Sequence, residues 1–390
     1  MHSSLNPYSP GSGLRPPALA GREAQLEAFD TLLARTGNGL QDRGMILWGL
    51  RGVGKTVLLN RLAVMARDHR WLVVEMEARP GAAGAATNRA QLGRELLKAG
   101  RRTLGARVRG RAKDAIGSIA SFSFRIGVTG MSLGIDRREG RADSGDLETD
   151  LEEVVEDVTS ALAPSRRGFA IFVDEMQELD EELLASLLSV QHLAGQRGWP
   201  FYVIGAGLPN LPARLSEARS YAERLFDYQE IGTLSTAAAD AALVQPARSH
   251  GASFVEEALA LLVDASGRYP YFIQEYGKAI WDVAQETPFT IDDAHAAVES
   301  GTAQLDQGFF PARWDRATPA ERAYLRAMAM DGDAGSRTGA VAERLGKDAG
   351  SLSPVRAQLI AKGLVYAPEH GRIAFTVPGM AAFIERQRTE

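Results

Sequence analysis

The segment Gly49–Thr56 constrains this chain more than any other part of it. It reads Gly-Leu-Arg-Gly-Val-Gly-Lys-Thr and fits the pattern G-x-x-x-x-G-K-[ST]. A short apolar run, Met45–Trp48, precedes it, and an apolar helical pattern, Val57–Ala66, follows it. Lysine is rare in this chain, so only ~0.01 chance matches to the pattern are expected. A strand, a glycine turn and a helix in this order predict a loop that cradles phosphate groups, rather than a glycine turn without a ligand.

The residue types in the loop explain how a triphosphate would bind. Its glycines let successive backbone N–H groups point at phosphate oxygens, and the N-terminus of the following helix adds its positive dipole. We expect the Lys55 ammonium group to neutralise the β and γ phosphates and to assist the reaction there. We expect the Thr56 hydroxyl to ligate Mg²⁺. The predicted nucleotide-binding residues of the loop are Gly49, Gly52, Val53, Gly54, Lys55 and Thr56.

Two adjacent acids follow a second apolar run, in the segment Phe169–Glu175. The run reads Phe-Ala-Ile-Phe-Val and leads directly into Asp174 and Glu175. Acids at the carboxyl end of a buried strand point into the crevice where ligands of open α/β sheets bind. Asp174 is expected to hold the Mg²⁺ ion through water, and Glu175 to orient or deprotonate the attacking water. Apolar strands that end in an acid are common, so the segment is informative only together with the glycine loop.

Short apolar runs recur along the first 231 residues and alternate with helical patterns. We expect an amphipathic helix from Gly21, with Leu26, Phe29, Leu32 and Leu33 on its apolar side. The alternation predicts a parallel sheet between two layers of helices, an α/β fold of the P-loop NTPase type. The expected strands are Met45–Trp48, Trp71–Met76, Phe169–Val173, Phe201–Ile204 and Tyr228–Ile231.

Length and composition limit the class of protein. The chain has 390 residues, of which 45% are hydrophobic and 24% charged, so it is long enough for more than one domain. It has no cysteine, which excludes disulfides, a thiolate nucleophile and cysteine-ligated metals. No apolar run reaches the ~18 residues of a membrane-spanning helix, so we expect a cytoplasmic protein without a membrane contact. The net charge of −5 does not by itself favour nucleic acid.

The stretch 79–145 separates the second and third expected strands and is too long for a simple crossover, so it is expected to be an insertion. Its first part is basic from Lys98 to Lys113. In Phe122–Val128 apolar and polar residues alternate, which predicts a strand that pairs with Met131–Ile135 in a hairpin. An acidic helix follows at 143–157. The basic stretch either pairs with this acidic helix or binds DNA or another polyanion.

Beyond Ile231 the strand patterns stop and helical patterns continue. We expect four parts: a flexible tail at 1–20, a nucleotide-binding core at 21–232, an α-helical lid at 233–311 and a winged-helix domain at 312–390. Thr318-Pro319-Ala320-Glu321 is a capping box with proline at the first helical position. Three helices and a hairpin across 368–371 then follow in the order of a winged helix.

The third of these helices can enter the major groove of DNA. It would leave Ser353, Arg356, Gln358 and Lys362 exposed, with His370 and Arg372 on the wing. The segment 318–390 is only slightly basic, and winged helices also contact proteins or act as autoinhibitory lids. Double-stranded DNA and a protein partner therefore both remain open.

Taken together, these motifs resemble an AAA+ or STAND-type P-loop ATPase, close to the archaeal-type and origin-recognition-type ATPases. Ala20-Gly21-Arg22-Glu23 before an apolar helix is similar to the adenine-side segment of that family, which implies base contacts near Gly21 and Arg22. Ser220–Phe226 resembles the place of an arginine finger, which implies that Arg224 acts on a neighbouring subunit. The alternative is that Arg224 pairs with a surface acid such as Glu223 or Asp227. The family's sensor positions fall near Asn210 and Arg268.

The resemblance implies a switch that binds and hydrolyses ATP with Mg²⁺, and in which nucleotide state controls how the lid and the winged helix pack. DNA binding through the winged helix is one expected partner contact, and an arginine finger at Arg224 would imply self-association. The alternative is a nucleotide-gated regulator or adaptor with little hydrolysis, whose winged helix contacts protein.

Overall fold

The computed structural model describes residues 2–11, 13–14, 16–105, 110–127 and 140–387. The chain divides into two compact units, each described by itself below. The sheet unit comprises residues 22–49 and 55–231, and the helical unit comprises 1–21, 50–54 and 232–390. Within the described ranges, no helix combines the length and the apolar character needed to cross a bilayer.

The sheet unit is built on five parallel strands in the order β2-β3-β4-β1-β5. The central strand β1 has β4 on one side and β5 on the other, so the loop after β1 emerges at the middle of the sheet. This arrangement confirms the predicted α/β fold and all five predicted strands. The strands are β1 (Gly44–Trp48), β2 (Leu72–Glu77), β3 (Phe169–Asp174), β4 (Phe201–Gly207) and β5 (Phe226–Glu230).

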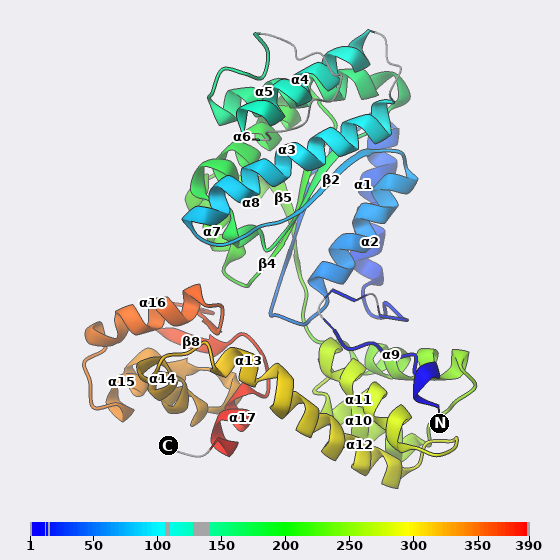
Figure 1. The fold of residues 1–390 in the computed structure, drawn as a ribbon, viewed down its shortest axis with the longest axis vertical. Coiled ribbons are helices and arrows are strands. Elements are labelled where there is room, and N and C mark those ends of the chain that lie inside the picture. The colour runs from blue at the N-terminus through cyan, green and yellow to red at the C-terminus, as the bar shows by residue number, and fades with distance from the viewer. Residues whose placement is uncertain (1, 12, 15, 106–109, 128–139, 388–390) are drawn as a thin grey trace. The chain divides into compact units, whose positions relative to one another are not determined.

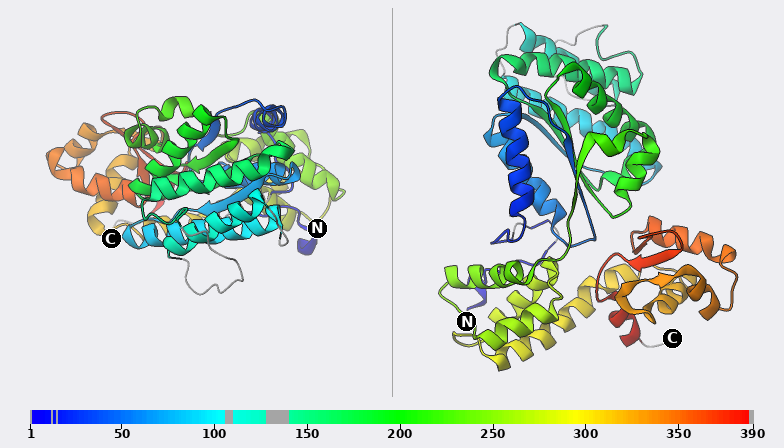
Figure 2. Two further views of the ribbon diagram at one scale, coloured as in Figure 1. Left: turned by 90° about the horizontal axis from the view of Figure 1, so that it is seen from above. Right: turned by 180° about the vertical axis from the view of Figure 1, so that it is seen from behind.

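Helices cover both faces of this sheet, as the two sides of the sheet in Figures 1 and 2 show. Helices α1 (Glu23–Gly37) and α2 (Lys55–Asp68) lie on one face. The Phe29 ring meets the edge of Phe172 there, and the Thr36 hydroxyl lies 2.8 Å from the hydroxyl of Tyr202. The opposite face packs against α5 (Leu147–Leu162), α6 (Glu181–Arg197), α7 (Leu211–Ala218) and α8 (Ala222–Leu225).

The described part of the predicted insertion contains two helices joined to the rest of the chain by turns and coil. Helices α3 (Ala82–Leu104) and α4 (Arg111–Arg125) pack against each other, and α4 packs against α5. The predicted strand at 122–128 is therefore wrong for residues 122–125, and its proposed partner, Met131–Ile135, lies outside the described residues. The helical period won because Ala115, Ile119 and Phe122 are all fully buried on one side of α4, whereas Phe124 points to solvent.

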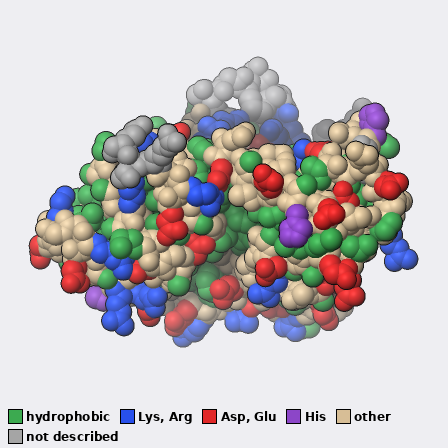
Figure 3. Space-filling view, turned by 90° about the horizontal axis from the view of Figure 1, so that it is seen from below, with side chains coloured by type: hydrophobic (Ala, Val, Ile, Leu, Met, Phe, Trp, Pro, Cys, Tyr) green, Lys and Arg blue, Asp and Glu red, His purple; other side chains and the backbone are tan. Residues whose placement is uncertain are grey.

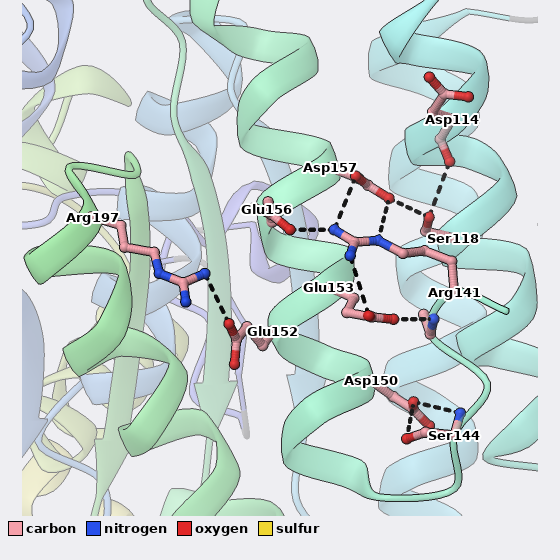
Figure 4. A network of polar contacts seen from close by, with 11 residues as sticks. Asp114, Ser118, Arg141, Ser144, Asp150, Glu152, Glu153, Glu156, Asp157 and Arg197 are labelled. Carbon is pink, nitrogen blue, oxygen red and sulfur yellow. Dashed lines mark hydrogen bonds and ion pairs between the residues drawn. The ribbon is translucent and has the colours of Figure 1, made fainter.

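The acids of α5 are held by arginines from the connections around it (Figure 4). Arg141 forms ion pairs with Glu153 at 3.2 Å and with Asp157 at 3.3 Å, and it also contacts Glu156. Arg197 at the end of α6 pairs with Glu152 at 2.9 Å. These partners come from outside the basic stretch 98–113. The ion pairs of α5 thereby hold Arg141, in the connection that precedes α5, and the C-terminal end of α6 against it.

The helical unit continues the chain after Ile231 with four helices that pack against one another. The bundle consists of α9 (Thr236–Ser249), α10 (Glu256–Ala265), α11 (Pro270–Val283) and α12 (Ile291–Gln304). A π-helical turn, Leu305–Phe309, and a short helix α13 (Pro311–Trp314) follow. Proline opens α11 because the first helical residue needs no N–H partner.

The C-terminal part of the helical unit has the helix and strand order expected of a winged helix. The predicted capping box is present, since Thr318 and Glu321 cap α14 (Pro319–Ala329) reciprocally. A strand, β6 (Ser336–Arg337), joins the hairpin in an antiparallel sheet of order β6-β8-β7. The other elements are α15 (Thr338–Arg344), α16 (Ser353–Ala361), β7 (Val365–Tyr366), β8 (Arg372–Phe375) and a final helix, α17 (Met380–Arg386), which the sequence did not reveal.

The N-terminal residues are not a free tail, contrary to the sequence-based expectation for 1–20. The ring of Tyr8 is buried, and its hydroxyl donates to the carbonyl of Leu243 on α9. The Asn6 side chain donates to the carbonyl of Lys278 on α11 at 3.1 Å. Gly277 permits this packing, because a Cβ atom there would lie 2.5 Å from the Tyr8 ring.

Candidate functional site

The glycine loop connects β1 to α2 as the sequence predicts. Gly52 and Gly54 have φ angles of 81° and 93°, a left-handed backbone that favours glycine. The Lys55 ammonium group is buried and donates to the Gly49 carbonyl at 2.9 Å, so it folds back over the loop. The Gly49 N–H donates to the Gly207 carbonyl at 3.1 Å, which ties the start of the loop to the end of β4. The Lys55 side chain thus contacts the first residue of its own loop.

The acid at the end of β3 faces the first turn of α2. The Thr56 hydroxyl donates to Asp174 Oδ2 at 2.6 Å, and the Glu175 N–H donates to Asp174 Oδ1 at 2.9 Å. Burial raises the pKa of the Asp174 carboxyl, while the hydrogen bond from Thr56 and the charge of Lys55 act to lower it. A hydroxyl and a carboxylate in contact are hard oxygen donors of the kind that Mg²⁺ prefers, so this pair fits the predicted metal site.

The second acid, Glu175, has a constrained backbone and a partner that the sequence did not indicate. Its φ of 48° is left-handed, which is unusual for a residue with a side chain. Gln177, in the short helix η3 (Met176–Glu178), donates to Glu175 Oε2 at 2.6 Å. The other end of Gln177 accepts a hydrogen bond from the Leu208 N–H at 3.1 Å. A single glutamine after a strand carries no motif, so this contact was visible only in the fold.

The middle of the loop, Leu50–Gly54, groups with the helical unit rather than with the sheet. The Arg51 N–H donates to the carbonyl of Thr376, just after β8, at 3.3 Å. A Cβ atom on Gly52 would lie 2.8 Å from the hydroxyl of Tyr269, which precedes α11. That hydroxyl is buried and has no hydrogen-bond partner among the described residues. The loop is therefore in contact with the beginning of α11 and with the end of the wing.

The sequence also singled out Gly21, Arg22, Arg224, Asn210 and Arg268. Gly21 has a φ of 71°, and a Cβ atom on it would lie 2.7 Å from Ala238 of α9. Arg22 is buried, and burial lowers its pKa. Asn210 follows β4 and caps α7, with its side-chain oxygen buried and unpartnered within the described ranges. Arg268 has a left-handed backbone in the turn before α11.

Arg224 lies in α8, just before β5, and its side chain is exposed. The sequence left open an ion pair with Glu223 or Asp227. Asp227 instead accepts a hydrogen bond from Gln229 at 2.7 Å, and no ion pair to Arg224 occurs among the described residues. The guanidinium group is consequently available on the surface of the sheet unit.

The residues that the sequence assigned to a DNA contact are partly engaged inside the helical unit. Lys362 donates to Glu321 at 2.6 Å, and Arg372 donates to the carbonyl of Ala334 at 3.2 Å. Ser353, Gln358 and His370 are exposed as expected. On the face drawn in Figure 3, basic and acidic side chains are interspersed and form no continuous basic area.

Comparison with protein families identifies two segments of this chain. Residues 18–204 match the AAA ATPase domain, and residues 307–384 match a domain of unknown function, DUF8462. No curated protein sequence matches the chain. The first match contains the glycine loop, Asp174 at the end of β3 and Glu175 directly after it. The second contains the winged-helix elements.

Solved structures resemble this chain over almost its whole length. The Walker-type ATPase PABY2304 of Pyrococcus abyssi is 15% identical with a TM-score of 0.61, and the alignment covers 98% of this chain and 99% of that chain. The Orc1 protein of Aeropyrum pernix, solved in complex with DNA, is 17% identical with a TM-score of 0.46, covering 95% and 94%. The RuvB Holliday junction branch migration motor of Thermotoga maritima is 16% identical with a TM-score of 0.46, covering 93% and 96%.

At these identities the structural likeness concerns the fold alone. The matched residues 18–204 include the loop, Lys55, Thr56 and both acids. Residues 18–204 thus match the AAA ATPase domain, and the whole chain resembles the Walker-type ATPase of Pyrococcus abyssi in fold.

Proposed function

We propose that this protein is a Mg²⁺-dependent ATPase whose nucleotide state controls the packing of the segments around the phosphate loop. The observation that carries the proposal is the 2.6 Å contact between the Thr56 hydroxyl and Asp174 Oδ2. This contact joins the first turn of α2 to the end of β3. Thr56 lies only two residues after Gly54, the last glycine of the loop. The loop residues that would bind the phosphates therefore lie next to the Asp174 carboxylate, as ATP hydrolysis requires.

Each residue of this site has a defined task. Backbone N–H groups of the loop and the Lys55 ammonium group would bind the β and γ phosphates. Thr56 and Asp174 would hold Mg²⁺, which neutralises the charge that develops on the phosphate oxygens. Glu175 would accept a proton from the attacking water or orient that water, because its carboxylate lies beside Asp174 but is not the partner of Thr56.

Two substitutions separate binding from chemistry. Glu175→Gln keeps the shape of the side chain and removes its basicity, so ATP should still bind while steady-state phosphate release falls by at least about a hundredfold. Lys55→Ala should instead weaken ATP binding itself. Unchanged phosphate release in Glu175→Gln would remove the assignment of the base, and unchanged ATP affinity in Lys55→Ala would remove the assignment of the site.

The contacts of Arg51 and Gly52 support the proposed switch. Phosphate binding draws loop amides toward the ligand, and the same short segment is packed on Tyr269 and hydrogen-bonded to Thr376. A ligand can shift such an arrangement only through a difference in its affinity for the two states. Limited proteolysis with ADP and with a non-hydrolysable ATP analogue should therefore give different cleavage patterns after residue 231. Identical patterns would contradict the switch.

The side chain of Arg224 is exposed and forms no ion pair with any residue that the structure describes, which supports self-association. An arginine finger acts on the γ phosphate held by a neighbouring subunit. Arg224→Ala should therefore lose turnover, and so should Glu175→Gln, but a mixture of the two variants should recover part of it, since Glu175→Gln subunits still carry the finger. Absence of recovery, together with a monomeric mass in solution, would contradict this role.

A second candidate function is a nucleotide-gated adaptor whose winged helix contacts protein rather than DNA. The observation that favours it is the pairing of Lys362 with Glu321, which removes one of the expected cations from the DNA-facing set. The two functions differ in duplex DNA binding. A DNA-binding protein should show affinity that falls steeply between about 50 and 200 mM salt. The adaptor should show no such salt-dependent binding at any nucleotide state.

A further inference from the structure

Gln177 occupies an unusual place between the two halves of the site. Its side chain is buried, with 4% of its surface exposed. The amide nitrogen donates to Glu175 Oε2 at 2.6 Å, and the amide oxygen accepts from the Leu208 N–H at 3.1 Å. One end of the side chain thus touches the acid after β3, and the other touches the backbone after β4.

The hydrogen bonds continue from Leu208 to the phosphate loop. The preceding residue, Gly207, ends β4, and its carbonyl accepts the hydrogen bond of the Gly49 N–H at 3.1 Å. A path of hydrogen bonds and one peptide unit therefore connects Gly49, the first residue of the loop, to Glu175. Every link in this path lies inside the sheet unit.

Glycine at position 207 is a condition for this path. A Cβ atom there would lie 2.4 Å from the Gln177 amide oxygen, so any side chain at position 207 would displace that amide. A family resemblance would place a polar sensor near the end of this strand. In the fold, the space beside Gly207 is filled by the amide of Gln177 instead, so a residue from the neighbouring strand end supplies the polar group.

We propose that Gln177 is a positioning residue that holds the Glu175 carboxylate in its working orientation and ties that orientation to the phosphate loop. An amide suits this task because it donates a hydrogen bond without bringing a charge that would neutralise the carboxylate. The left-handed backbone of Glu175 is held in part by the hydrogen bond from its N–H to the Asp174 carboxylate. The inference rests on the proposed function, in which Glu175 acts on the attacking water.

The chain offers a matched control for the test. Gln191, on α6, is also 4% exposed, and its amide oxygen also accepts from a backbone N–H of β4, that of Val203, at 2.7 Å. Gln177→Met and Gln191→Met each remove a buried amide and leave one backbone N–H of the β4 region without a partner. Both should therefore lower thermal stability to a similar extent. Only Gln177→Met should alter the orientation of the Glu175 carboxylate.

Steady-state ATPase kinetics give the decisive readout. Gln177→Met should lower kcat by about tenfold to a hundredfold with KM and the affinity for ADP within about twofold, because orientation in the reaction is lost while nucleotide binding is kept. Gln191→Met should leave kcat unchanged. Equal kcat in the two variants would overturn the proposal and leave Gln177 a structural residue.

A second variant covers the case in which Gln177→Met does not fold. Gly207→Ala leaves the glutamine in place but pushes its amide away from Leu208, and it should reproduce the fall in kcat; an unchanged kcat overturns the proposal. The parallel measurement on Glu175→Gln distinguishes the two levels of inference. If Glu175→Gln keeps full turnover, the proposed base fails. If Glu175→Gln is inactive while Gln177→Met is fully active, only the positioning role fails.

Discussion

The contact between Gly52 and Tyr269 predicts that two glycines of one loop differ in their tolerance of alanine. Gly52 and Gly54 both have left-handed φ angles, 81° and 93°, so an alanine at either position pays about 1–2 kcal/mol for that backbone. Only at Gly52 does the new methyl group meet a neighbour. It would lie 2.8 Å from the Tyr269 hydroxyl and 3.0 Å from the ring carbon Cε1, whereas a methyl group on Gly54 has nothing within 4 Å.

The difference between the two variants isolates this contact. Overpacking of a buried site costs about 1–3 kcal/mol, so Gly52→Ala should be less stable than Gly54→Ala by that amount in chemical denaturation of the ligand-free protein. Adding Tyr269→Ala should remove most of the extra cost in a double-mutant cycle, because the crowded partner is then absent. Equal stability of Gly52→Ala and Gly54→Ala would refute the packing of Tyr269 on the loop and the reasoning built on it.

Three further predictions concern buried polar groups. Burial raises the pKa of Asp174, so the stability linked to its protonation is complete below about pH 4 and is lost as the pH rises through the raised pKa. Asp174→Asn should therefore raise the melting temperature at neutral pH, with a smaller gain at pH 4. The same variant should lose Mg²⁺-dependent turnover. Burial acts to raise the pKa of Glu321, but the hydrogen bonds from Lys362 and Thr318 outweigh it and lower the pKa. This pair therefore stabilises the fold above about pH 4 and less so as the pH falls through the lowered pKa, and Lys362→Met should cost about 1–3 kcal/mol in denaturation at pH 7 and less in acid. Tyr8→Phe removes a buried hydroxyl from its carbonyl partner and should cost about 1 kcal/mol, measured in the same way; no change in stability would show that residues 6–8 do not dock on the helical bundle.

Local patterns predicted the parts of the site that are local in sequence. The loop Gly49–Thr56 sits between strand and helix because the glycines, the lysine and the flanking apolar runs all act within one β–α unit. The five strands were equally readable from runs of buried residues such as Phe169–Val173, and the capping box at Thr318 marks the start of α14. These features depend on neighbours a few residues apart, so the sequence states them directly.

Features that depend on strand order escaped prediction. Gln177 matters only because β3 and β4 are neighbours, which brings Leu208 beside it from 31 positions along the chain. Periodicity also misled in one place. The alternation at Phe122–Val128 has the period of a strand, but Ala115, Ile119 and Phe122 supply a longer helical stripe that packs on α3 and α5. The helical spacing of the buried residues from 115 to 122 therefore determined the structure, and the short alternation after it did not.

The hydrogen bond from the Arg51 amide to the Thr376 carbonyl makes a built-in reporter of the helical unit. Deuterium uptake at this amide requires that bond to open, so its protection records how often the end of the wing leaves the loop. The main chain alone forms the link, so among substitutions at these two residues only proline at position 51 removes its donor. The exchange rate of this single amide in the predicted nucleotide-binding loop therefore reports how often the segment after β8 separates from the loop.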